Sequence, residues 1–113
     1  MVARQTKSEA GLNLLFRALA DGTRRDILAR SLTATPSVSE LAARYDMSFA
    51  AVQKHVAVLE RAGLIHKRAT GREQRVSTNH ARLQRAGELL DHFESIWRQH
   101  IAQLDDVLRT KGD

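Results

Sequence analysis

The sequence predicts a mainly α-helical fold with one two-stranded β-hairpin. Apolar residues recur at helical spacing over most of the 113 residues, and a glycine-centred turn at residues 70–72 separates two short extended segments. A chain of this length is expected to form one domain, residues 1–113. Because it contains no Cys, disulfides and thiolate metal sites are excluded.

Two helices are expected before residue 36. The first, over residues 9–20, carries an apolar face made of Leu12, Leu15, Phe16 and Leu19. Asp21 then offers a capping oxygen for a second helix, which ends in the stretch 33–36. A short third helix is expected to open at Ser37 or Ser39, with Leu41 and Ala42 as its buried candidates.

The fourth helix, expected over residues 48–62, has two unlike faces. On a wheel of about 100° per residue, Val52, Val56 and Leu59 form a buried stripe. The far face is small, amide-bearing and singly cationic, and consists of Ala50, Gln53, Lys54 and Ala57. Small residues allow close approach to another surface, Gln pairs with an adenine edge, and Lys reaches guanine or phosphate. His55 lies at the boundary of the stripe, where packing or phosphate contact is a better reading than metal ligation.

A hairpin is expected after Gly63, with strands over residues 64–69 and 73–79. Its tip carries Arg68, Arg72 and Arg75, which either protect a sheet edge from aggregation or contact phosphates and the minor groove. Residues 54–85 hold eight basic and two acidic residues, a balance of +6 that exceeds the chain's net charge of +5. This concentration favours a nucleic-acid partner.

The last helix, expected over residues 80–110, is longer than the core of one small domain requires. Its apolar residues recur at heptad spacing, which is typical of a dimer seam or of a large apolar groove. Packing on the chain's own domain explains one face but not the apolar tail over residues 96–108. We therefore expect a homodimer in which this helix and the first one contact the partner through Leu12, Leu15, Phe16, Leu19, Leu90, Phe93, Trp97, Ile101, Leu104 and Leu108.

This order of elements is that of a winged helix-turn-helix, in which residues 9–79 are the DNA-binding core and wing and residues 80–110 the dimerisation helix. Three stretches resemble the ArsR family of bacterial winged-helix regulators: D-G-T-R-R-D-I-L at 21–28, V-S-E-L-A at 38–42, and M-S-F-A-A-V-Q-K-H-V-A-V-L-E-R-A-G-L-I at 47–65. The resemblance implies a homodimeric repressor that binds operator DNA near its own promoter. Ser48, Ala50, Gln53 and Lys54 are then expected to face the major groove, with His55 flanking it.

Two departures and two missing metal sites qualify this resemblance. Gln53 stands where the family usually has Ser, so the family's base preference does not carry over; Gly22 replaces a usual Pro. The Cys-x-Cys metal site of the third helix is absent, and the spacing of His92 and His100 does not match the family's last-helix site. Residues 93–98 are similar to a subgroup that lacks a metal site, so we expect no metal and no cofactor.

Other function classes find little support in the sequence. It has neither a nucleophile elbow nor a glycine-rich phosphate loop, so an enzyme is not expected. Without a membrane-spanning run or a signal peptide, we expect a cytoplasmic protein. The alternative is a winged-helix module for protein–protein interaction without specific DNA binding. A small-molecule or protein effector stays open.

Overall fold

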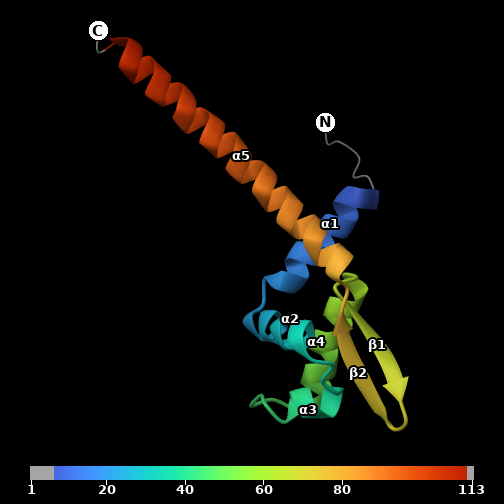
Figure 1. Ribbon diagram of the computed structural model, residues 1–113. Helices are drawn as coiled ribbons and strands as arrows, with labels where there is room; N and C mark the ends of the chain where they lie inside the picture. Colours follow the sequence, from blue (N-terminus) through green and yellow to red (C-terminus); the bar gives the residue numbers. More distant parts are fainter. Residues whose placement is uncertain (1–6, 112–113) are drawn as a thin grey trace, which may run out of the picture. The chain divides into compact units, whose positions relative to one another are not determined.

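A computed structural model describes residues 7–111 and confirms the predicted fold class (Figure 1). The elements, in chain order, are α1 (Lys7–Leu19), α2 (Gly22–Thr33), α3 (Val38–Ala42), α4 (Phe49–Arg61), β1 (Ile65–Thr70), β2 (Glu73–Thr78) and α5 (His80–Lys111). Two compact units divide the chain between Leu83 and Gln84. The first unit holds α1 to α4, the hairpin and the first turn of α5, and the second holds the rest of α5.

One hydrophobic core lies within the first unit. Side chains from each of its first six elements are almost completely buried there: Leu15, Ile27, Leu41, Val52, Val56, Leu59, Leu64, Ile65 and Val76. The predicted stripe of α4 is thus confirmed, because its three members have at most 1% of their surface exposed. Burial of these aliphatic side chains fixes the orientation of α4 and therefore determines which of its residues face solvent.

Side-chain caps fix the starts of the three central helices. Asp21 accepts a hydrogen bond from the backbone N–H of Arg24, Ser37 from Glu40, and Ser48 from Ala51, at 3.0, 3.0 and 3.1 Å. Each cap satisfies a backbone donor that the first turn of a helix leaves without an intrahelical partner. Of the two predicted starts for α3, the structure selects Ser37.

The end of α4 is a Schellman turn centred on Gly63. Gly63 has φ of 78°, a left-handed conformation that is costly for residues with a Cβ. Its N–H donates to the carbonyl of Glu60 at 2.9 Å, and the N–H of Leu64 donates to the carbonyl of Leu59 at 3.0 Å. This turn ends α4, reverses the direction of the chain within two residues and leads into β1.

The hairpin is antiparallel, and Thr70 pairs with Glu73 at its tip. The loop therefore has only two residues, Gly71 and Arg72, and Gly71 has φ of 62° while Arg72 does not have a positive φ. These signs are typical of a type II′ turn, whose twist matches that of the flanking strands. The turn leaves the side chain of Arg72 exposed at the end of the hairpin.

The helix α5 has 32 residues, which corresponds to a length of about 48 Å. The predicted helix over residues 80–110 is confirmed to within one residue at its end. Large apolar side chains are exposed along it: Leu90, Phe93, Ile96, Trp97, Ile101, Leu104, Val107 and Leu108.

Candidate nucleic-acid interface

The solvent-facing side of α4 is the first part of the candidate interface. Ala50, Gln53 and Lys54 are exposed, as the wheel predicts, and Ala57 is half-buried. The hydroxyl oxygen of Ser48 accepts the capping hydrogen bond from Ala51, so its O–H remains available as a donor. The exposed face therefore combines a short polar start, a side-chain amide and one ammonium group.

His55 is bound to the start of α2 instead of standing free beside this face. Its Nδ1 lies 3.2 Å from Nη1 of Arg24 and 3.8 Å from Oδ2 of Asp21. Arg24 is itself fixed, because it donates to the carbonyls of Ala18 at 2.8 Å and Arg17 at 3.1 Å. Of the two roles expected for His55, the geometry favours packing between α4 and α2.

The same contacts perturb Asp21. The hydrogen bond from the backbone N–H of Arg24 lowers the pKa of Asp21, and the nearby His55 and Arg24 side chains lower it further against the opposing effect of desolvation. Asp21 therefore stays ionised at neutral pH, as a helix N-cap requires for the strongest capping. This carboxylate links the first residues of α2 to α4.

The hairpin supplies the second part of the interface. Arg68 and Arg72 are exposed, and no ion pair joins either guanidinium to another residue within 7–111. An open groove of about 740 Å³ lies beside the strands; it is lined by Thr35, His66, Lys67, Arg68, Thr70, Arg75 and Ser77. Lys67 is paired with Glu60 at 3.5 Å and Arg75 with Glu40 and Glu73, so Arg68 is the cation of this groove that suits a phosphate contact best.

Arg75 does not project from the hairpin tip as the sequence analysis expected. Its Nη1 donates to the carbonyl of Thr35 at 3.0 Å and to Oε1 of Glu40 at 3.1 Å, and its Nη2 donates to Oε2 of Glu73 at 2.7 Å. A guanidinium with three internal acceptors is largely committed to the fold. Arg75 therefore holds β2 against α3, which makes it a weaker candidate for DNA contact than Arg68 and Arg72.

A second polar cluster fixes the turn between α3 and α4. The hydroxyl of Tyr45 donates to Oδ2 of Asp26, and Nε of Arg30 donates to the same oxygen at 2.9 Å. These two hydrogen bonds, that of Tyr45 foremost, lower the pKa of Asp26. Burial, followed by the carboxylate of Asp26, raises the pKa of Tyr45 to about 12. The cluster ties the helix-turn-helix turn to α2.

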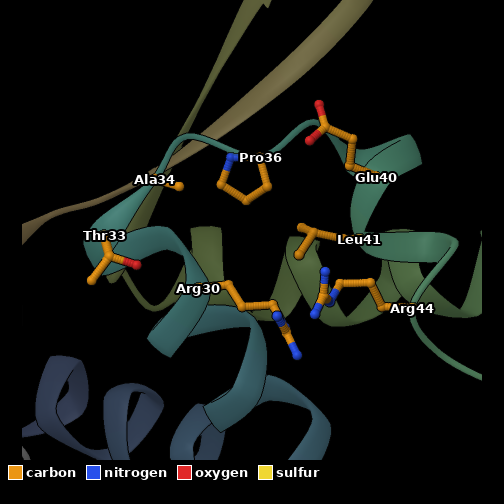
Figure 2. A pocket seen from close by; sticks show the side chains of 7 residues that line it. All are labelled: Arg30, Thr33, Ala34, Pro36, Glu40, Leu41 and Arg44. Atoms are coloured by element: carbon orange, nitrogen blue, oxygen red, sulfur yellow. The ribbon is translucent and has the colours of Figure 1, made fainter.

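Beside this cluster lies a small pocket between the end of α2 and α3. Figure 2 shows the side chains of Arg30 and Arg44 pointing toward one another on one side of Leu41, with Pro36 and Glu40 on the other side. Its volume is about 220 Å³. Helical periodicity does not predict this pocket, because it does not show how the end of α2 and the following helix pack against each other.

A hollow of about 230 Å³ joins the two parts of the interface. It lies between the start of α4 and the hairpin tip, and its lining residues are Val38, Ser39, Phe49, Gln53, Arg72, Glu73 and Gln74. Gln53 and Arg72, predicted separately from the helix wheel and the turn, are thus brought to one surface. Phe49 was missed by the sequence analysis, although it lies close to Gln53 on the wheel.

The residues expected at a dimer interface fall into three groups by their burial within the single chain. Leu15 is fully buried within its own chain, so it has no surface left for a partner and that expectation was wrong. Leu12, Phe16 and Leu19 are half-buried in α1. The α5 members are all exposed: Leu90, Phe93, Trp97, Ile101, Leu104 and Leu108.

Within residues 7–111, no three His, Asp or Glu side chains gather closely enough to hold a metal ion. In the same part of the chain, none of the helices combines the length and apolar character needed to span a membrane.

Known proteins share this architecture. A family described as a helix-turn-helix domain matches residues 19–68. The HTH-type transcriptional regulator Rv2034 of Mycobacterium tuberculosis is 32% identical over 98 residues, which are 87% of this chain and 89% of that protein. An ArsR-like transcriptional regulator from Rhodococcus sp. RHA1 superimposes with a TM-score of 0.78 at 30% identity, over 95% of this chain and 98% of that one.

Two further solved structures agree with this fold. An ArsR family transcriptional regulator, RHA00566, is 31% identical, with a TM-score of 0.74 over 85% of this chain and 97% of that one. The homodimeric winged helix-turn-helix DNA-binding domain Mb0332 of Mycobacterium bovis, at 20% identity and a TM-score of 0.63, shares the fold over 84% of this chain and 91% of that one.

Fold and interface together define a winged helix-turn-helix protein in which α3 and α4 form the helix-turn-helix and the β1–β2 hairpin is the wing. The chain belongs to the ArsR family of bacterial DNA-binding transcriptional regulators. The relatives named above are described as regulators of transcription.

Proposed function

We propose that this protein is a dimeric repressor that reads the major groove of operator DNA with α4 and touches the backbone or minor groove with the wing. The observation that carries the proposal is the shared hollow, where Gln53 of α4 and Arg72 of the wing line one surface. A base-reading amide and a phosphate-directed guanidinium in one concave surface match the two kinds of contact that DNA recognition requires.

Each residue of this surface has a distinct role. Gln53 makes a bidentate pair with an adenine edge, and Lys54 reaches guanine or a phosphate. Ala50 has no long side chain and so allows the helix to enter the groove. The hydroxyl of Ser48 donates a hydrogen bond to a DNA phosphate at the start of α4, where the helix dipole also favours negative charge. Arg68 and Arg72 neutralise phosphates beside the wing.

The homodimer rests on the exposed apolar face of α5. Trp97 and Leu108 have 60% and 68% of their surfaces exposed in the single chain, and an apolar face of this length is costly in water. Pairing two copies through α5, and through Leu12, Phe16 and Leu19 of α1, covers these apolar side chains and gives two reading helices. The operator is then a pseudo-palindrome with half-sites about 34 Å apart.

Repression follows when such a site overlaps a promoter, because the bound dimer excludes RNA polymerase. A regulator of this kind meets its operator in the cytoplasm, and we place the protein there. Residues 9–79 act as the DNA-binding part and residues 80–110 as the dimerisation helix.

Selection from a pool of random duplex DNA tests this proposal. We expect purified wild-type protein to recover a two-fold symmetric consensus, and we expect Gln53→Ala to recover an altered one. Gln99→Ala, a substitution on α5 outside the reading surface, serves as the matched control and keeps the wild-type consensus. Recovery of no consensus by the wild-type protein would contradict the proposal and favour a winged-helix module that binds proteins.

A further inference from the structure

Phe49 places a large apolar side chain at the entrance of the proposed reading surface. It is the first residue of α4 and has 46% of its surface exposed. It lines the same 230 Å³ hollow as Gln53 and Arg72. An aromatic side chain buries a large apolar area when it is covered, so an exposed one in a hollow offers a strong apolar contact.

Phe49 does not belong to the buried core of the first unit. Val52, Val56 and Leu59 of the same helix have at most 1% of their surfaces exposed, whereas Phe49 has 46% exposed. The helix start is already fixed by the Ser48 cap. Packing of α4 on the core and capping of its start therefore do not explain why part of the aromatic ring is exposed.

The surroundings of the ring indicate what it contacts. Apart from Val38, the lining residues that accompany Phe49 are polar: they supply amide, hydroxyl and guanidinium groups and the carboxylate of Glu73. That carboxylate is paired with Arg75 at 2.7 Å, whereas the guanidinium of Arg72 has no ion pair within residues 7–111, so the hollow suits a polar, negatively charged polymer better than an apolar protein partner. In the major groove, the one strongly apolar feature of a base edge is the C5-methyl group of thymine, and Phe is among the side chains that contact it.

We propose that Phe49 is a specificity-determining residue that reads the C5-methyl group of a thymine one or two base pairs from the pair contacted by Gln53. This inference rests on the proposed function and adds a base to it. Phe49 and Gln53 are four residues apart, which is a rise of about 6 Å along the helix. Since base pairs are spaced by about 3.4 Å, the thymine lies one or two base pairs from the adenine that Gln53 contacts.

The test removes the methyl group from the DNA. Starting from the consensus that wild-type protein selects, each thymine is replaced in turn by deoxyuridine, which keeps its pairing edge and lacks only the methyl. Binding is measured for the wild type, for Phe49→Ala and for Leu32→Ala, a matched exposed aliphatic residue on α2 with 49% exposure. Phe49→Leu, which retains an apolar body, provides a second variant should the alanine variant unfold.

For the wild type and Leu32→Ala, we expect replacement of one particular thymine per half-site by deoxyuridine to lower the affinity about fourfold. This is the factor that corresponds to the burial of one methyl group. We expect Phe49→Ala to bind thymine and deoxyuridine equally at that position, and Phe49→Leu to keep part of the discrimination. A wild type that is indifferent to every replacement would overturn the inference, as would equal losses in wild type and Phe49→Ala. A selection that yields no consensus would instead overturn the proposed function.

Discussion

The guanidinium of Arg75 lies 3.1 Å from the carboxylate of Glu40 and so joins the second strand of the wing to α3. The same Nη1 donates to the carbonyl of Thr35, and the backbone N–H of Val76 donates to the carbonyl of Pro36 at 2.9 Å. The wing is thus held midway along its second strand by contacts with the loop before α3. We call the contacts of Arg75 with Glu40 and Thr35 the clamp. The clamp positions the tip of the wing, where Arg72 is exposed, relative to α4.

Substitution of the clamp is expected to affect the wing and not the reading helix. Arg75→Ala should lower the free energy of unfolding by about 1 kcal/mol, because the ion pair is partly exposed but the bond to the Thr35 carbonyl is lost as well. Glu40→Gln should cost less. Equilibrium denaturation of both variants and of the double variant measures the coupling. Additive effects would show that the two residues act independently.

Gln53 and Arg72 are expected to give opposite binding phenotypes. Gln53→Ala should change sequence preference more than overall affinity, because it removes a contact with a base edge. Arg72→Ala should weaken binding to all sequences alike and reduce the slope of log affinity against log salt by about two for a dimer. Anisotropy titrations at several salt concentrations measure both effects. The reverse pattern would show that the two roles are assigned wrongly.

Tyr45 is the only tyrosine of the chain, so its ionisation can be followed directly by phenolate absorbance. Its pKa of about 12 in the folded state lies above the ordinary value of 10.0. Folding therefore favours the protonated form of Tyr45. The contribution of this preference to the free energy of unfolding is fully present below about pH 10 and is lost as pH rises towards 12. We expect the absorbance titration of native protein to have its midpoint well above that of protein unfolded in denaturant.

Tyr45→Phe provides the stability arm of the same experiment. It removes the hydrogen bond to Asp26 and should lower the free energy of unfolding at neutral pH by about 1 kcal/mol. The wild type should lose stability between about pH 10 and 12 as the Tyr45 hydroxyl ionises, and Tyr45→Phe should lack this part of the loss. A wild-type midpoint near the ordinary tyrosine value would contradict the described environment of Tyr45.

The face of α5 is expected to control the oligomeric state. Trp97→Glu and Leu104→Glu each place a charge within the apolar stripe and should shift the protein to monomers with weaker operator binding. Gln99→Glu adds the same charge on the opposite side of the helix and should leave the dimer intact. Sedimentation equilibrium measures the state of each variant. Dimerisation unaffected by both stripe substitutions would place the interface elsewhere.

Local features of the fold could be predicted from the sequence because their causes lie within a few residues. The cap at Ser48 and the left-handed turn at Gly63 follow from short-range chemistry, and the buried stripe that begins at Val52 follows from helical periodicity. The exposure of Gln53 and Lys54 follows from the same wheel.

Features that depend on distant residues could not be predicted in this way. Arg75 turns towards Glu40 and Thr35, 35 and 40 residues away, and His55 towards Arg24, 31 residues away. Strand alternation and helix wheels carry no information on such partners. For the same reason, the wheel identifies Leu15 as apolar and inward-facing but does not distinguish burial in its own chain from burial against a partner.

The central claim is that this chain is a sequence-specific, dimeric DNA-binding protein. A mobility-shift titration against the DNA upstream of its own gene, with excess unrelated DNA and at low and physiological salt, tests it most directly. We expect a discrete, competitor-resistant complex that contains two protein chains and persists at physiological salt. Binding that unrelated DNA or physiological salt abolishes would contradict the claim, because the basic surface would then supply only nonspecific affinity.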